Sequence, residues 1–187
     1  MPHIAIISAS VRTGRVSHRV ALFFEKYLEA NSLATCEILD LQAYNFPVFN
    51  ERLKYQPSPA AEVLDFAHRV AKADGIIIVT PEYNGGYPAS LKNVTDLLYE
   101  EWHRKPIGIS TVSDGGFGGT QVITSLQFTL WKMRAWMVPA MFPVPFVSKA
   151  FDEYGRLLDG AAFEKRAATF VNELLWCVTA KNRMNSV

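Results

Sequence analysis

The stretch G-I-I-I-V-T-P-E-Y-N-G-G-Y-P-A-S-L-K-N-V-T-D, residues 75–96, joins an apolar run to a turn and then to a helical pattern. The run from Gly75 to Thr80 is apolar enough for a central strand that is buried on both faces. After the turn, Leu91–Glu101 has the spacing of a helix. A buried strand followed by a loop and a helix is the repeating unit of a parallel α/β sheet.

The same alternation continues in both directions along the chain. Further strands are predicted at Ile4–Ser8, Cys36–Leu41 and Pro106–Val112 and within Met137–Val147, and further helices at Val16–Ala30, Ala60–Ala73, Thr120–Trp136 and Phe163–Lys181. Ala43–Pro59 is expected to be a loop, and the tail 182–187 is expected to be disordered. Five strands that alternate with helices predict a three-layer αβα sandwich in one domain, residues 1–187.

Composition and charge exclude several classes of function. The formal net charge of +1 gives little support for nucleic-acid binding, which favours a basic patch. Cys36 and Cys177 are too few for a disulfide framework. The first apolar run is too short for a secretory signal, and Ala135–Val147, with three prolines, is too short to span a bilayer. We therefore expect a cytoplasmic protein with no membrane partner.

The first loop, S-A-S-V-R-T-G-R-V-S-H at Ser8–His18, is rich in groups that bind anions. It carries four hydroxyl groups and the guanidinium groups of Arg12 and Arg15. The N-terminus of the following helix adds N–H groups and the positive end of a dipole. Gly14 stands alone, so the G-x-G-x-x-G fingerprint of a pyrophosphate site is absent. The loop predicts a monophosphate site, with a capped helix start and two solvated arginines as the alternative.

The second loop, P-E-Y-N-G-G at residues 81–86, suits a flat polar ligand. The proline presets φ and Gly85–Gly86 frees the backbone, so that Tyr83 and Asn84 can face a ring system and its hydroxylated chain. We expect Glu82 to form an ion pair that holds the loop or an interface, in preference to acting as a general base. An ordinary strand-to-helix turn is the alternative.

The third loop, S-D-G-G-F-G-G-T at Ser113–Thr120, has four glycines among eight residues. Its backbone N–H groups are predicted to be free to bind carbonyl groups of a heterocycle edge, with a flexible turn as the alternative. In the flavodoxin-like strand order 2-1-3-4-5, the strands before the three loops are neighbours. The ligand crevice of that order lies between strands 1 and 3, where flavodoxin holds FMN. The three loops together therefore predict an FMN site.

These residues match a known pattern, because the chain resembles the NADPH-dependent FMN reductase family, which includes chromate and quinone reductases and azoreductase-like enzymes. The resemblance covers nearly the whole chain and rests on S-x-R-x-G-R-x-S at Ser10–Ser17, P-E-Y-N at Pro81–Asn84, L-K-N-x-x-D at Leu91–Asp96 and S-x-G-G-x-G-G at Ser113–Gly119. It implies that FMN is bound by Ser10, Arg12, Ser17, His18, Pro81, Glu82, Tyr83, Asn84, Gly85, Ser113, Asp114, Gly115 and Gly116.

Two positions depart from the family pattern. Ala9 stands where the family often has glycine, and we expect it to restrict the backbone and lower the affinity for FMN. His18 stands where a small polar residue is frequent. Neither change removes a group that donates to phosphate.

The resemblance also implies an activity. We expect an oxidoreductase that passes hydride from NADPH or NADH through bound FMN to a quinone, azo compound, metal oxyanion or free flavin. It needs no metal and no side chain as catalytic acid or base. A homodimer or homotetramer is expected through the helices at 91–101 and 120–136. Their apolar residues fit either a subunit interface or the core, and they are Leu97, Leu98, Trp102, Leu126, Leu130 and Trp131. The alternatives are a non-enzymatic flavodoxin-like electron carrier and a protein that kept the fold but lost the flavin.

Other motifs in the chain carry less weight. Cys177–Arg183 has the C-x5-R spacing of a phosphatase nucleophile loop, but it lies in an apolar helical pattern without glycine. The four histidines show no spacing typical of a metal site. G-x-S-x-G is absent, which argues against a serine hydrolase.

Overall fold

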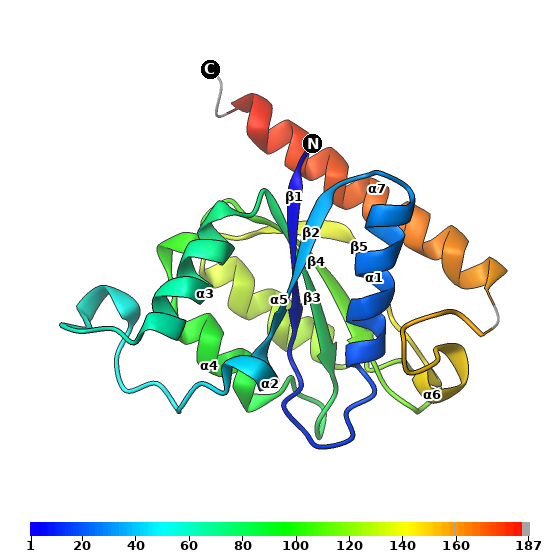
Figure 1. The fold of residues 1–187 in the computed structure, drawn as a ribbon, viewed down its shortest axis with the longest axis horizontal. Helices are drawn as coiled ribbons and strands as arrows, with labels where there is room; N and C mark the ends of the chain where they lie inside the picture. Colours follow the sequence, from blue (N-terminus) through cyan, green and yellow to red (C-terminus); the bar gives the residue numbers. More distant parts are fainter. Residues whose placement is uncertain (159, 185–187) are drawn as a thin grey trace.

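The computed structural model of the chain describes residues 1–158 and 160–184 (Figure 1). Within these residues, five parallel strands form one sheet in the order β2-β1-β3-β4-β5. The strands are β1 (His3–Ser8), β2 (Thr35–Asp40), β3 (Gly75–Pro81), β4 (Pro106–Val112) and β5 (Trp136–Met141). The predicted fold class and the strand order 2-1-3-4-5 are therefore confirmed.

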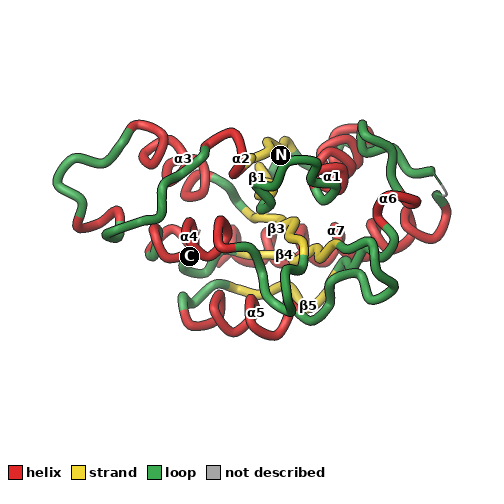
Figure 2. Tube along the Cα trace, turned by 90° about the horizontal axis from the view of Figure 1, so that it is seen from below, coloured by secondary structure: helices red, strands yellow, loops and turns green. Residues whose placement is uncertain are grey.

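Helices cover both faces of this sheet (Figures 1 and 2). The helices are α1 (His18–Ala30), α2 (Leu41–Tyr44), α3 (Ala61–Lys72), α4 (Ala89–Leu97), α5 (Val122–Lys132), α6 (Val147–Ala150) and α7 (Ala161–Met184), with 3-10 turns η1 (Leu53–Tyr55) and η2 (Glu100–Trp102). In β1, Ala5 and Ile7 pack with α3, α4 and α5, whereas Ile4 and Ile6 pack with α1 and α7. This alternation produces the three predicted layers, because successive strand residues face opposite sides.

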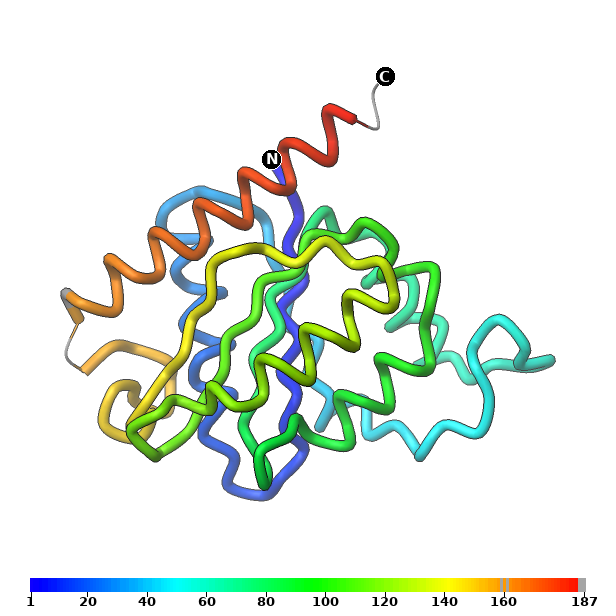
Figure 3. The backbone as a smooth tube through the Cα atoms, turned by 180° about the vertical axis from the view of Figure 1, so that it is seen from behind, coloured from blue at the N-terminus to red at the C-terminus, as the bar shows by residue number. Residues whose placement is uncertain are grey.

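The carboxyl ends of the strands lie at one edge of the sheet. The loops after β1 and β3, blue and green in Figure 3, protrude side by side at this edge. The loop after β4 follows at the next strand, since Pro81 of β3 pairs with Val112 of β4. The topology therefore brings the three loops together.

Some boundaries differ from the predicted ones. Helix α5 ends at Lys132 and not at Trp136, because Arg134 takes a φ of +61° that a right-handed helix does not allow. The expected loop 43–59 contains the end of α2 and all of η1, and α6 was not predicted. Helix α7 continues to Met184, so 182–184 is helical where a disordered tail was expected. The rest of that tail, 185–187, lies outside the described residues.

The apolar residues that the sequence left open between a subunit interface and the core mostly belong to the core of the chain. Leu97, Leu98, Trp102, Leu126 and Leu130 are at most 3% exposed. Trp131 differs, because its side chain is 62% exposed and lies beside the equally exposed Phe128 on α5. The part of the chain that the structure describes contains no helix long and apolar enough to cross a membrane.

Candidate flavin site

The first and second loops are joined by side-chain contacts. The Tyr83 hydroxyl lies 2.6 Å from the Ser10 Oγ, and the Arg12 guanidinium lies 5.4 Å from the centroid of the Tyr83 ring. Behind these contacts, Ser90 at the start of α4 donates to the Ala9 carbonyl at 2.6 Å. The structure thus brings the predicted residues Ser10, Arg12 and Tyr83 to one place.

The N-terminus of α1 has the free donors that an anion site needs. Ser17 precedes the helix and is 3% exposed, and its hydroxyl caps no backbone N–H group. Among the described residues, the N–H groups of Val16, Ser17 and His18 have no hydrogen-bond partner. Unpaired N–H groups at a helix N-terminus bind phosphate well. This donor set fits the phosphate of FMN.

His18 occupies the first position of this helix and contacts the end of β1. Its Nδ1 lies 3.0 Å from the Ser8 Oγ. Burial and the nearby Arg15 charge lower the pKa of His18, although Asp40 opposes them. Burial and Arg15 together therefore favour the neutral imidazole. The His18 ring thus contacts Ser8 at the start of the first loop, at a position where the family often has a small polar residue.

The two arginines of the first loop have different surroundings. Arg15 makes a two-pronged ion pair with Asp40 at the end of β2. Arg12 is exposed, and no described carboxylate lies within ion-pair distance of it. From the sequence, both arginines were candidates to bind the phosphate. Only Arg12 has a guanidinium group that is available to do so.

The second loop is a tight hairpin turn. The N–H of Tyr83 donates to the Gly86 carbonyl at 2.8 Å, and the N–H of Gly86 donates to the Tyr83 carbonyl at 3.1 Å. Asn84 and Gly85 have φ of +53° and +78°. Two central residues with positive φ define a type I′ turn, for which Asn-Gly is the preferred pair. The backbone freedom therefore belongs to Asn84 and Gly85, and not to Gly85 and Gly86 as predicted.

Two other predicted residues flank this turn. Pro81 ends β3, and both Pro81 and Glu82 are partly buried. Within the described residues Glu82 forms no ion pair, so the ion pair expected inside the loop is not found there. Ala9 is fully buried and is not among the residues with positive φ, so its backbone conformation does not require glycine.

The third loop is held by its neighbours at both ends. The N–H of Ser113 donates to the Val144 carbonyl at 3.0 Å, and its hydroxyl donates to the Gly115 carbonyl at 3.1 Å. The Asp114 carboxylate accepts from the N–H and the hydroxyl of Ser148 at 3.0 and 2.9 Å. Asp114 therefore connects the loop to α6, a partner 34 residues away that the sequence did not reveal.

The glycines of this loop fall into two groups. Gly115 and Gly116 are exposed, and in the described part of the chain their N–H groups have no hydrogen-bond partner. Gly118 and Gly119 are buried and have φ of +63° and +73°. Only the first pair can offer N–H groups to a ligand, whereas the second pair shapes the turn.

The L-K-N-x-x-D motif contributes a contact that sequence reasoning did not assign. Asn93 accepts from the Phe49 N–H and donates to the Pro47 carbonyl, both at 2.8 Å. Lys92 and Asp96 form an ion pair along the same helix. The motif therefore ties the segment after α2 to α4, beside the first loop.

Replacing Asn93 with alanine is expected to lower the free energy of unfolding by about 1–2 kcal/mol, because two backbone groups of that segment lose their partner. Asn31→Ala is the matched control, since it removes an amide side chain that donates at 2.8 Å to one exposed backbone carbonyl, that of Tyr27, in another part of the chain. It should cost less than Asn93→Ala in urea unfolding. Limited proteolysis should cleave Asn93→Ala faster within 46–50, and equal cleavage of both variants and wild type would contradict the role.

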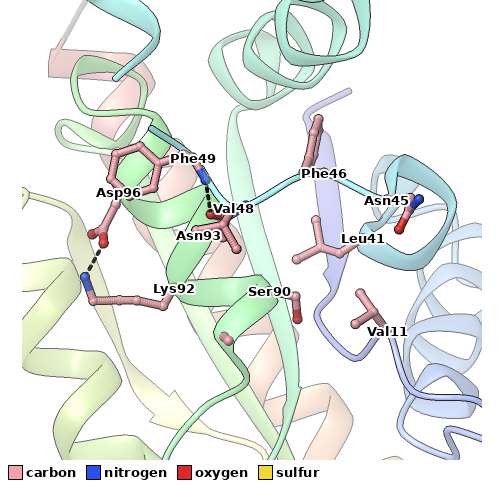
Figure 4. Close-up of a pocket in the computed structure, with 11 residues that line it drawn as sticks. Val11, Leu41, Asn45, Phe46, Val48, Phe49, Ser90, Lys92, Asn93 and Asp96 are labelled. Atoms are coloured by element: carbon pink, nitrogen blue, oxygen red, sulfur yellow. Dashed lines mark hydrogen bonds and ion pairs between the residues drawn. The ribbon is translucent and has the colours of Figure 1, made fainter. Parts of the chain in front are cut away.

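A pocket of about 430 Å³ opens between α4 and the segment after β2 (Figure 4). Its walls are mainly apolar and comprise Val11, Leu41, Asn45, Phe46, Val48, Phe49, Ala89, Ser90, Lys92, Asn93 and Asp96. None of the predicted cofactor residues lines it, and it touches the first loop only at Val11. The predicted flavin residues lie outside this pocket, on the three loops themselves.

The described residues include no group of three or more His, Cys, Asp or Glu side chains that could hold a metal ion. Cys177, from the C-x5-R sequence, is 1% exposed within α7. A buried helical thiol is not cradled by free N–H groups, so it lacks the surroundings of a phosphatase nucleophile.

Comparison with known proteins gives both family and fold. A family model described as NADPH-dependent FMN reductase matches residues 2–149. The chain is 35% identical over 144 residues to an NAD(P)H-dependent FMN reductase of Saccharomyces cerevisiae, covering 70% of this chain and 74% of that protein. It is 29% identical over 181 residues to a quinone reductase of Pseudomonas putida, covering 90% and 94%. The solved structure of the flavoenzyme NAD(P)H:(acceptor) oxidoreductase FerB from Paracoccus denitrificans has a TM-score of 0.75 at 21% identity, covering 95% of this chain and 97% of that one.

Proposed function

Because the chain belongs to the NADPH-dependent FMN reductase family, we propose that it takes hydride from NADPH or NADH and passes it by way of bound FMN to a small acceptor. A quinone is the acceptor best supported, since a relative that matches 90% of this chain is a quinone reductase. When bound, FMN supplies the redox chemistry, and the protein supplies placement and electrostatics.

The observation that carries this proposal is the donor set at the start of α1. Arg12 brings a guanidinium group that pairs with no described carboxylate, and Ser17 brings a buried hydroxyl beside helix N–H groups that have no partner in the described part of the chain. A monophosphate dianion satisfies all of these donors, and charge-assisted hydrogen bonds are the strongest kind. Ser10 keeps Tyr83 against the first loop, which supports a second loop that lies next to the proposed phosphate site.

The other two loops complete the site. In this proposal the ribityl chain and ring pass along the turn at Asn84–Gly85, and the N–H groups of Gly115 and Gly116, which have no partner among the described residues, bind the polar edge of the ring. Backbone N–H groups do not change their protonation state with pH, so binding of the ring edge should not depend on the pKa of a side chain.

The test is spectroscopic. Purified protein saturated with FMN should lose its flavin absorption under NADPH or NADH without oxygen and regain it when a quinone is added. Failure to bind FMN at micromolar concentrations would overturn the proposal. Slow bleaching by both nucleotides, with rapid electron exchange only to a protein partner, would favour the electron-carrier alternative.

We also propose that the protein is a homodimer or homotetramer. The exposed aromatic pair Phe128 and Trp131 on α5 supports this, because paired exposed aromatic side chains are typical of an interface. Light scattering of the purified protein should give at least twice the mass of 21.0 kDa. A monomer at micromolar concentration would contradict this prediction.

A further inference from the structure

Asp40 lies outside every motif that pointed to the flavin site. It ends β2 and pairs in register with Ser8, the first residue of the first loop. Its carboxylate also accepts from the Gln42 N–H at 3.0 Å and so caps α2. Asp40 is therefore part of the sheet edge, next to the proposed phosphate site.

The contact between Asp40 and Arg15 is a two-pronged ion pair. Both terminal nitrogens of Arg15 donate to Asp40, one to each oxygen. The two side chains are only 11% and 21% exposed, so solvent screens the pair less than a surface pair. The planar guanidinium matches a carboxylate in this geometry, and the pairing sets the direction of the Arg15 side chain.

The same guanidinium reaches the backbone of the first loop. Arg15 donates to the Ser10 carbonyl at 2.7 Å. The Gln42 side chain makes longer contacts of 3.4 and 3.5 Å with the carbonyls of Val11 and Arg12. Three consecutive carbonyls of the loop thus accept hydrogen bonds, one from Arg15, which Asp40 holds, and two longer ones from Gln42 in α2.

Two consequences follow for a phosphate ligand. The Ser10 hydroxyl and the Arg12 side chain project from the backbone that Arg15 holds, so their position depends on the ion pair. Arg15 is already neutralised by Asp40 and is not free to approach the ligand. The loop therefore has one arginine that supports it and one that is available to bind.

We propose that Asp40 is a positioning residue for FMN, which holds the first loop through Arg15 in the shape that binds the phosphate. This inference rests on the proposed function. It predicts an effect on the phosphate alone, so FMN and riboflavin should respond differently, because riboflavin has the same ring and ribityl chain without phosphate.

The test measures dissociation constants for FMN and for riboflavin by quenching of flavin fluorescence. Asp40→Asn should weaken FMN binding about tenfold and change riboflavin binding less than twofold. Arg15→Lys keeps the charge but loses the two-pronged geometry, and it should show the same selective loss. Combining both changes should weaken FMN binding no more than the larger single effect, because the two residues act as one unit.

Glu100→Gln is the matched control, since it removes one carboxylate from the exposed pair with Lys54, away from the three loops. It should leave both affinities unchanged. Equal weakening of FMN and riboflavin in Asp40→Asn and Arg15→Lys would show a general structural role and overturn the proposal. Unchanged or tighter FMN binding would also overturn it, because a freed Arg15 would then serve the phosphate equally well. A wild-type protein that binds neither flavin would refute the proposed function itself.

Discussion

Replacing Gly118 with alanine is expected to lower the free energy of unfolding by about 2–5 kcal/mol. Gly118 has a φ of +63°, and this left-handed conformation costs a residue with a Cβ about 1–2 kcal/mol. The added Cβ would lie 2.9 Å from the Pro145 nitrogen and 3.0 Å from the Val144 nitrogen. Both are backbone atoms that cannot rotate away, and overpacking of this kind costs about 1–3 kcal/mol.

The same change should weaken FMN binding. Thr111 donates to the Gly118 carbonyl at 2.7 Å, so a displaced Gly118 also disturbs the end of β4. Gly115 and Gly116, which offer the free N–H groups, lie just before it in the same loop. Urea unfolding and FMN titration measure the two effects.

Gly115→Ala is the control, because its φ is not positive and the nearest atom to the added Cβ is the Ser113 Oγ at 3.7 Å. It should change the free energy of unfolding by less than about 0.5 kcal/mol. If Gly118→Ala proved equally mild, Val144 and Pro145 would have to move at little cost, and the loop would not be shaped as described.

The contrast between Gly115 and Gly118 shows what the sequence of a glycine-rich loop leaves open. Four glycines in a loop indicate backbone freedom, but they do not say which residue uses it. The answer depends on Val144 and Pro145, whose backbone approaches Gly118 only in the folded chain. Likewise, Asn84 and Gly85 take the positive φ angles of the turn, although the backbone freedom was assigned to Gly85 and Gly86, because the hairpin hydrogen bonds join Tyr83 to Gly86.

The fold was largely predictable because its signal is local. The apolar run at 75–80 is buried along its whole length, as a central strand must be. Short elements such as α2 and α6 were not predictable, since a four-residue helix has no hydrophobic period. Helix α5 ends before the predicted Trp136 because Arg134 has a positive φ, and no local sequence pattern indicates that φ.

The site was predictable as a set of loops but not as a set of roles. Motif spacing and strand order were enough to predict that the loops lie together, and the first loop does contact Tyr83 of the second. The partners of Arg15, Asp114 and Asn93 lie 25 to 46 residues away, and no local pattern names them. Long-range partners decide which polar side chains are free for a ligand, so the sequence alone could not separate binding residues from supporting ones.

Replacing Arg12 with alanine is expected to weaken FMN binding about 10- to 150-fold, since a hydrogen bond to a charged group contributes about 1.5–3 kcal/mol and the phosphate loses the guanidinium group that no described carboxylate pairs with. Riboflavin binding should change little, because riboflavin carries no phosphate. Arg12 also lies over the Tyr83 ring, so part of any loss could arise from a disturbed second loop.

The comparison of FMN with riboflavin separates these causes, and Arg52→Ala is the matched control. Arg52 is also exposed and lies 5.2 Å from the centroid of the Tyr99 ring, so its removal deletes the same charge and the same kind of ring contact away from the three loops. It should leave the dissociation constant for FMN unchanged. If Arg12→Ala weakened FMN and riboflavin equally, its role would be to support Tyr83 and not to bind phosphate. If Arg12→Ala bound FMN as tightly as wild type, the free N–H groups and Ser17 would be sufficient for the phosphate, and the division of labour between Arg12 and Arg15 would be wrong.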